Sequence, residues 1–347
     1  MFGDSTNLWQ IGIDPRTYQS SSEPKRLTWG TSFEWKPTVA IQAGKKLSVA
    51  FANLEENVDL WAIPLPPDRR NTAQPRRLTE EISTEQHSSL SPDGKTLAFV
   101  SNRTGSFQIW LKNLDTGEQT LLTTSPAEKY WPLFSRDGAY LTYATTGRWD
   151  VRRLRLSNGA DDLIWDSGGV ASSWTIGDEG IFFWDVPGRV SLMDLASRRT
   201  ALLLAKENSR LIGTQLSPDG HWVVFKAMTG AYSQIFVAPY RGPSKIDERD
   251  WIAISERLPG LSMSIWRADG EAVYLTSDRD GYPCLWEQPL NSLTKRPMGP
   301  PVAVYHAHSA QYSMRPTVSE TALSASADML IFTLAERKGG VWMAEWK

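Results

Sequence analysis

The sequence predicts an all-β fold, a β-propeller of about seven four-stranded blades with a composite closing blade. Three observations predict it. A short motif returns at intervals of 40 to 50 residues, apolar residues alternate between turn-forming residues, and no segment carries an apolar stripe of helical spacing. The chain also has 16 tryptophans beside 25 glycines and 21 prolines. Such a composition is typical of many short strands joined by tight turns.

The repeated motif is clearest at residues 91–99, where Ser-Pro-Asp-Gly precedes an alternating apolar strand. Copies follow at 135–143, at 217–225 and, more loosely, at 267–275, so that their Asp residues lie 44, 82 and 50 positions apart. The interval of 82 covers two repeats, with an Asp-Glu-Gly sequence at its midpoint, residues 178–180. Each Asp-Gly predicts a tight turn, because glycine accepts a positive φ and Asp can bond its own backbone.

Each repeat predicts four antiparallel strands in a fixed order. The Asp-Gly turn joins the first strand to the second, and a polar turn such as 102–105 or 278–281 joins the second to the third. A short fourth strand, as at 77–79, closes many of the units. Tryptophan recurs on the third strands, where we expect it to pack between neighbouring blades, at Trp61, Trp110, Trp286 and Trp342.

The repeats predict a single propeller domain that covers residues 1–347. A composite seventh blade would form where residues 7–28 pair with 314–347, which removes the free sheet edges. A chain that begins within a blade is expected to be cut from a longer one, and a count of eight blades stays open. The other expected blades cover approximately 33–79, 85–123, 129–165, 172–204, 211–254 and 261–305.

Composition argues against several classes of partner. Lys and Arg total 37 against 39 Asp and Glu, a net charge of -2, so no basic surface for nucleic acid is expected. The single cysteine, Cys284, excludes an intrachain disulfide framework. The apolar runs are too short for membrane insertion by this chain. We expect a monomer whose protein partner or small ligand is unknown.

The pattern from Ser91 to Trp110 resembles the TolB-type, WD-like propeller repeat. Residues 234–242, 277–286 and 300–309 resemble the propeller half of bacterial regulators, in which a Ser/Thr kinase or winged-helix domain precedes the propeller. This resemblance implies a binding or sensing module in bacterial signalling, with no catalytic motif to carry over. It implies an extracytoplasmic location if the parent is a membrane-anchored kinase, and otherwise a cytoplasmic one.

Motifs for catalysis and metal binding are missing from the sequence. Neither a Gly-x-Ser-x-Gly elbow nor His-Glu-x-x-His occurs, so we expect no enzymatic activity. His306 and His308 could chelate one cation, but two ligands are too few and a third would have to come from another blade. Residues 278–281 lack the remainder of a calcium loop and are expected to form a hairpin turn. No metal and no cofactor are predicted.

The predicted function is therefore a non-enzymatic binding or sensing module that serves as a platform for protein–protein interaction. The alternatives are a small-ligand or oligosaccharide sensor and, third, a propeller enzyme such as a lyase or lactonase. Residues in and before the first strands should converge near one channel mouth, where they would suit a planar, polar or anionic group. These predicted binding residues are Trp35, His87, Tyr130, Trp131, Trp174, His306, His308, Tyr312 and Arg315.

Overall fold

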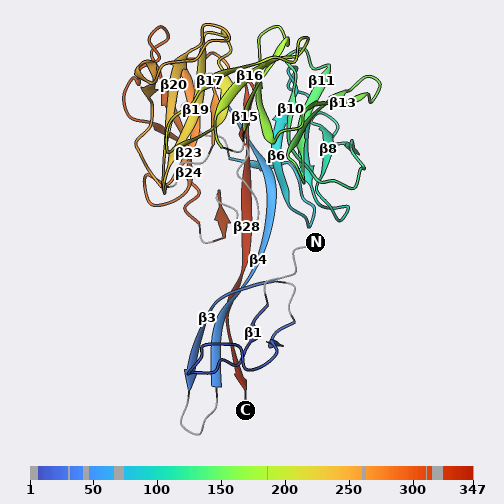
Figure 1. The fold of residues 1–347 in the computed structure, drawn as a ribbon, viewed down its shortest axis with the longest axis vertical. Helices are drawn as coiled ribbons and strands as arrows, with labels where there is room; N and C mark the ends of the chain where they lie inside the picture. Colours follow the sequence, from blue (N-terminus) through green and yellow to red (C-terminus); the bar gives the residue numbers. More distant parts are fainter. Residues whose placement is uncertain are drawn as a thin grey trace. The chain divides into compact units, whose positions relative to one another are not determined.

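In the computed structural model of the chain, nearly all regular secondary structure is β (Figure 1). The part of the chain that is described contains one short 3-10 turn, Glu248–Asp250, and no helix that is long and apolar enough to cross a membrane. The structure describes residues 7–29, 32–41, 47–65, 74–185, 187–259, 263–309, 311–314 and 323–346.

The chain folds into two compact units. Residues 58–335 form the propeller unit, and residues 1–57 together with 336–347 form the terminal unit. The sequence predicted one domain instead, and the difference arises because two long strands each contribute residues to both units. These strands are β4 (Leu47–Pro64) and β28 (Met329–Trp346).

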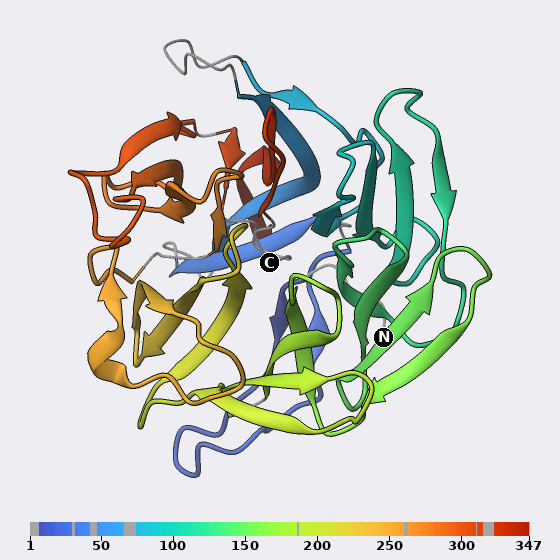
Figure 2. The same ribbon diagram turned by 90° about the horizontal axis from the view of Figure 1, so that it is seen from above.

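Five sheets of the propeller unit each contain four consecutive antiparallel strands, arranged around a common centre in Figure 2. The first has β6 (Glu85–Leu90), β7 (Thr96–Ser101), β8 (Gln108–Asn113) and β9 (Gln119–Leu121). The second has β10 (Lys129–Phe134), β11 (Tyr140–Thr145), β12 (Asp150–Arg155) and β13 (Asp161–Trp165). The third has β14 (Gly169–Trp174), β15 (Gly180–Asp185), β16 (Val190–Asp194) and β17 (Thr200–Leu204).

The remaining two of these sheets follow the same order. One has β18 (Arg210–Leu216), β19 (Trp222–Thr229), β20 (Tyr232–Pro239) and β21 (Ile252–Ala253). The other has β22 (Ser264–Trp266), β23 (Ala272–Ser277), β24 (Cys284–Pro289) and β25 (Val302–Tyr305).

A composite blade, built from strands near the N-terminal and the C-terminal ends of the chain, completes the propeller. β27 (Leu323–Ala325) pairs with β28, β28 pairs with β4, and β4 pairs with β5 (Arg76–Arg77). The same sheet also contains β26 (Tyr312–Ser313) and β3 (Phe33–Ile41). The described strands of the propeller unit therefore form six blades, five continuous and one composite.

The predicted all-β propeller with a composite blade is confirmed. Seven sheets are present among the described residues, but they are not seven equal blades: five have four strands, the composite sheet has six, and one has two. The closing segment also differs from the prediction. Residues 25–28 do not complete the composite blade, because Lys25–Arg26 (β2) pairs with Trp9–Gln10 (β1) in the two-stranded sheet. The closing strands are β4 and β5.

The predicted Asp-Gly turns are present where the repeat places them. At Asp93 the side chain accepts hydrogen bonds from the Ser91 hydroxyl at 2.6 Å and from the backbone N–H of Lys95 at 3.0 Å. Gly94 has a φ of 71°, a conformation that favours glycine. Serines also join neighbouring blades, since Ser89 accepts from the Phe134 N–H at 3.1 Å.

The third-strand tryptophans do not share one environment. Trp286 is buried, Trp61 and Trp110 are half-buried, and Trp342 lies in the terminal unit with 59% of its surface exposed. The expectation that Trp342 packs between blades is therefore wrong, because its part of β28 belongs to the terminal unit. An arginine guanidinium lies over each of the other three rings. The distances from Cζ to the ring centroid are 5.9 Å for Arg77–Trp61, 4.6 Å for Arg103–Trp110 and 5.1 Å for Arg279–Trp286.

The terminal unit contains the two-stranded sheet of β1 and β2 and has its own small core. β3 pairs antiparallel with β4, and Val49 and Phe51 are buried together with Leu8. β28 approaches β4 so closely that a Cβ on Gly339 would lie 2.1 Å from the carbonyl oxygen of Asn53. Glycine is therefore required at this position.

Candidate functional site

The innermost strands of four continuous blades carry bulges at the same point of the repeat; in β14 the register shifts after Ala171, and the other three share a left-handed residue at the bulge. The pairing register shifts after Gln86 in β6, after Tyr130 in β10 and after Ile212 in β18. In each of these three strands the first bulged residue lies six positions before the Asp of the following turn and has a left-handed backbone. These residues are His87 (φ 48°), Trp131 (φ 50°) and Gly213 (φ 65°).

Two of these three residues carry large rings on a backbone that suits glycine. A left-handed conformation is unstrained for Gly213, but it costs of the order of 1–3 kcal/mol for a residue with a side chain. His87 and Trp131 therefore hold their rings at the cost of local strain. Such strain is concentrated at functional sites, which directs attention to the space that these rings face.

That space is a cavity of about 110 Å³ on the propeller axis. All six blades contribute to its lining through their innermost strands or the residues just before them, which identifies it as one mouth of the central channel. Five of the lining residues occupy the same repeat position, six before the Asp of the turn or its equivalent: His87, Trp131, Ser172, Gly213 and Met263. Leu323 of β27 supplies the sixth side.

Aromatic rings dominate one side of this mouth. The His87 and Trp131 rings lie 4.6 Å apart between centroids, with a tilt of 37°. Tyr130 lies edge-on to His87 at 5.7 Å, Trp149 lies 5.3 Å from Trp131, and Trp184 lies edge-on to Trp131 at 6.1 Å. We call these five residues the aromatic mouth: His87, Tyr130, Trp131, Trp149 and Trp184.

A second cavity, of about 280 Å³, occupies the other end of the channel, nearer the Asp-Gly turns. It shares Ser88, Leu133, Ser172, Gln215 and Leu323 with the mouth cavity, so the two lie end to end.

The charged group of this second cavity is Arg136, and burial lowers the pKa of its guanidinium. Its Nη2 lies 3.4 Å from the carbonyl oxygen of Leu216, and its Nε lies 3.4 Å from that of Trp174. No carboxylate is among the described residues that line either cavity. The described channel lining thus lacks the acidic groups that general acid–base catalysis often uses.

The structure brings together three of the predicted binding residues, His87, Tyr130 and Trp131. Trp174 is only 2% exposed and lines the second cavity, where it stacks on Tyr140. Tyr312 packs edge-on against Trp61 in the composite sheet, at 5.8 Å between centroids.

Two of the other predicted binding residues fall outside the described part of the propeller unit. Trp35 belongs to the terminal unit and pairs with Ala52. Arg315 lies outside the described residues. Sequence reasoning missed Trp149, Trp184 and the small residues of the mouth. The signal for Ser172, Gly213 and Met263 was available in their constant distance from the turn Asp.

His306 and His308 form a separate group on the fifth continuous blade. Both are exposed, and Asp280 of the β23–β24 turn lies between them: its Oδ2 is 3.2 Å from His306 Nδ1 and 2.9 Å from His308 Nε2. Buried Cys284 completes a set of four ligand atoms that all lie within 4.8 Å of one another. Burial raises the pKa of the Cys284 thiol to about 11.

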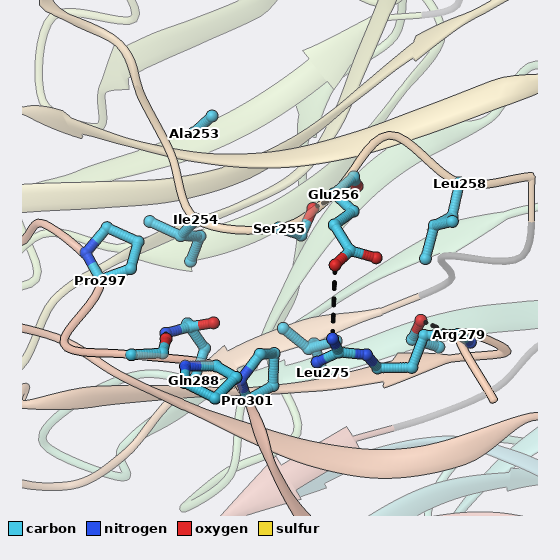
Figure 3. Close-up of a pocket in the computed structure, with 13 residues that line it drawn as sticks. Ala253, Ile254, Ser255, Glu256, Leu258, Leu275, Arg279, Gln288, Pro297 and Pro301 are labelled. Carbon is cyan, nitrogen blue, oxygen red and sulfur yellow. Dashed lines mark hydrogen bonds and ion pairs between the residues drawn. The ribbon is translucent and has the colours of Figure 1, made fainter.

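A cleft between the fourth and fifth continuous blades is a further candidate for binding (Figure 3). It has a volume of about 270 Å³, and its walls come from residues 253–258 on one blade and from Leu275, Arg279 and Gln288 on the next. Glu256 and Arg279 face each other across it in an ion pair of 3.3 Å. This pair joins the two blades at the outer part of the propeller.

Comparison with known proteins supports the fold. No family model matches the sequence. Over 178 residues the chain is 28% identical to the uncharacterized protein Atu1656 of Agrobacterium fabrum, a match that covers 46% of this chain. The chain spans 59% of the length of that relative.

Solved structures give the wider match. A putative TolB from Agrobacterium tumefaciens aligns with a TM-score of 0.61 and 16% identity over 82% of this chain and 99% of that one. TolB from Acinetobacter baumannii aligns with a TM-score of 0.54 and 16% identity over 83% of this chain and 66% of that one. An oligogalacturonate lyase from Vibrio parahaemolyticus aligns with a TM-score of 0.47 and 12% identity over 82% of this chain and 96% of that one. A similarity this low carries no argument about activity. The chain therefore contains a β-propeller with the fold of TolB.

Proposed function

We propose that the propeller unit is a non-enzymatic protein-binding module that receives a planar side chain of its partner at the aromatic mouth. The observation that carries this proposal is the pair of strained residues, His87 and Trp131, at one repeat position of adjacent blades. Their rings present adjoining faces to a cavity lined by all six blades. We further propose that this module serves a bacterial regulatory protein, a part that rests on the resemblance of residues 277–286.

The hydrogen-bonding groups of the mouth favour a protein side chain over a sugar. The Ser88 hydroxyl contacts the Ser324 hydroxyl at 3.0 Å, and the Ser172 hydroxyl donates to the carbonyl oxygen of Phe182 at 3.3 Å. These serines already have partners within the protein, whereas a sugar requires many polar groups to match its hydroxyls. Aromatic side chains gain about 0.5–1.5 kcal/mol from ring pairing beyond the area they bury.

Selection from a displayed random peptide library tests this proposal. Peptides are selected on the wild-type protein, and their affinities are measured by fluorescence anisotropy. Trp131→Gly removes the ring at a position whose backbone suits glycine, and we expect about 30-fold weaker binding, the effect of losing an aromatic anchor of about 2 kcal/mol. Gly213→Asn places a side chain in the mouth and should also weaken peptide binding. The variant is expected to fold, because Asn tolerates a left-handed backbone and open space surrounds the Cβ position.

Tyr232→Ala is the matched control. This ring is 48% exposed on β20 and lies outside the channel, so its loss should leave peptide binding unchanged. If the selected peptides bind Trp131→Gly and Gly213→Asn as tightly as they bind the Tyr232→Ala control, the binding site lies elsewhere. The cleft of Figure 3 would then be tested next. Oligosaccharides that bind in a Trp131-dependent manner, with no peptide selected, would favour the sugar-sensor alternative. Turnover of a bound sugar or peptide would contradict the non-enzymatic assignment.

A further inference from the structure

We propose that Asp280, Cys284, His306 and His308 bind one zinc ion at the rim of the propeller. The site is independent of the aromatic mouth. Its donors are two imidazole nitrogens, one sulfur and one carboxylate oxygen, and their ligand atoms all lie within 4.8 Å of one another. Zinc in structural sites takes four ligands of these types in a tetrahedron.

The topology of one blade brings these residues together. Asp280 lies in the turn between β23 and β24, Cys284 begins β24, and the two histidines follow β25. In a four-stranded blade, the turn between the second and third strands and the connection after the fourth lie at the same rim. The third and fourth ligands therefore come from the same blade as the histidines, which removes the reason for which the sequence predicted no metal.

The distances from Asp280 to the two histidines are close to those of a tetrahedral zinc site, and the whole set lies within 4.8 Å. Bonds of about 2.0–2.1 Å to nitrogen and oxygen imply ligand–ligand separations of about 3.3 Å. Asp280 Oδ2 lies 3.2 Å from His306 Nδ1 and 2.9 Å from His308 Nε2. Only small side-chain movements are needed, since both imidazoles already face the carboxylate. The thiol loses its proton to solvent as it binds the cation.

Surrounding residues hold the ligands in place. Trp286 lies edge-on to His306 at 5.5 Å, and Tyr282 lies 4.7 Å from the His308 ring. The N–H of Tyr282 lies within 3.4 Å of Asp280 Oδ1, which leaves Oδ2 directed at the imidazoles. Ala307, between the two histidines, is buried and its backbone contacts the Cys284 sulfur. Such contacts beyond the ligands typically change metal affinity by 10- to 100-fold.

Zinc binding is tested on the full chain after removal of any affinity tag. Isothermal titration with zinc should give one site, and cobalt should give a tetrahedral visible spectrum together with a thiolate charge-transfer band. In Cys284→Ser we expect loss of that band and affinity weaker by at least about 100-fold, because loss of a ligand should cost more than the roughly 10- to 100-fold typical of outer-shell partners. His308→Ala should weaken zinc similarly, and because His308 is exposed this variant is expected to fold even if the cysteine variant does not.

His221→Ala is the matched control, because His221 is exposed in the Asp-Gly turn of another blade and should not affect zinc. Zinc should also raise the melting temperature of the wild type but not of His308→Ala. The proposal is overturned if the wild type binds no zinc, or if His221→Ala weakens zinc as much as His308→Ala does. It is also overturned if the cobalt spectrum lacks the thiolate band, which would mean that Cys284 is no ligand.

Discussion

Backbone strain at Trp131 can be measured by replacing the residue with glycine and with alanine. Both substitutions remove the indole and the same ring contacts, so the difference between them reports the backbone alone. With φ at 50°, alanine pays about 1–2 kcal/mol for the left-handed conformation, whereas glycine adopts it freely. Glycine loses about 0.4–1 kcal/mol through the greater freedom of its unfolded chain. The balance predicts that Trp131→Gly is more stable than Trp131→Ala by about 0.5–1 kcal/mol.

An ordinary strand position provides the comparison. Leu202 on β17 is 39% exposed and is not among the residues of positive φ. There glycine should be less stable than alanine by about 0.5–1 kcal/mol. The difference in unfolding free energy between the glycine and the alanine variant should therefore have opposite signs at positions 131 and 202. A systematic error that affects both positions alike would not change the sign.

Urea unfolding, followed by circular dichroism and tryptophan fluorescence, measures the four variants. Midpoint shifts convert to free energies where the slope is unchanged and the two probes give coincident transitions. If Trp131→Ala proves as stable as Trp131→Gly or more so, position 131 is not strained. The argument that places function at the aromatic mouth would then lose its main support.

Three further predictions concern stability. Arg103→Ala removes the guanidinium that pairs with the buried carboxylate of Glu85 at 3.2 Å and that covers the Trp110 ring. The free energy of unfolding, measured in urea, should fall by about 3 kcal/mol, and a fall below about 1 kcal/mol would contradict this role. Gly339→Ala should increase hydrogen exchange in residues 47–57, because the added Cβ would meet the Asn53 carbonyl oxygen. Gly340→Ala is the control and should leave the exchange unchanged, since open space surrounds its Cβ. Equal exchange in the two variants would argue against the close approach of β28 to β4. Burial raises the pKa of Glu85 above its unfolded value, so the folded state binds more protons and stability falls as pH rises from about 4 through the folded pKa. Glu85→Gln should flatten that slope in urea midpoints measured against pH, and an unchanged slope would mean that other groups cause it.

The five continuous blades were predictable because each one is bounded by turn-forming residues. The predicted blade at 129–165 coincides with β10 to β13, and the predicted 85–123 differs from β6 to β9 by two residues at one end. A composite blade was predicted, but its strands were assigned wrongly because β4 has no such boundary. Val49 and Phe51 of this strand are buried in the terminal unit, and Val58, Leu60, Ala62 and Ile63 of the same strand are buried in the propeller unit. The predicted blade at 33–79 had separate second and third strands here, whereas β4 is one continuous strand with residues in both the terminal unit and the propeller unit.

The candidate sites were predictable only in part, because contacts between blades depend on where each loop lies around the rim. His306 and His308 were recognised as a possible chelating pair from their spacing. The role of Asp280 beside them was not recognised, since its turn had been compared with calcium loops rather than with the connection after β25. Likewise the repeat located Trp131 near the channel, but the ring of Trp184 reaches it from β15, a strand that is not innermost.

The repeat separates positions that hold the fold from a position that is free to differ. The turn residues are constrained, as the hydrogen bonds of Ser91 and Asp93 illustrate, and a change there would disturb the blade. Six residues before the Asp, a bulge sets the backbone in the first four continuous blades, and the side chain faces the channel. This position carries imidazole and indole on the first two continuous blades, hydroxymethyl and hydrogen on the next two, and a thioether on the fifth. Since the fourth blade lies opposite the first in a ring of six, Gly213 leaves space across the channel from His87, and a planar group inserted there would stack on the aromatic side.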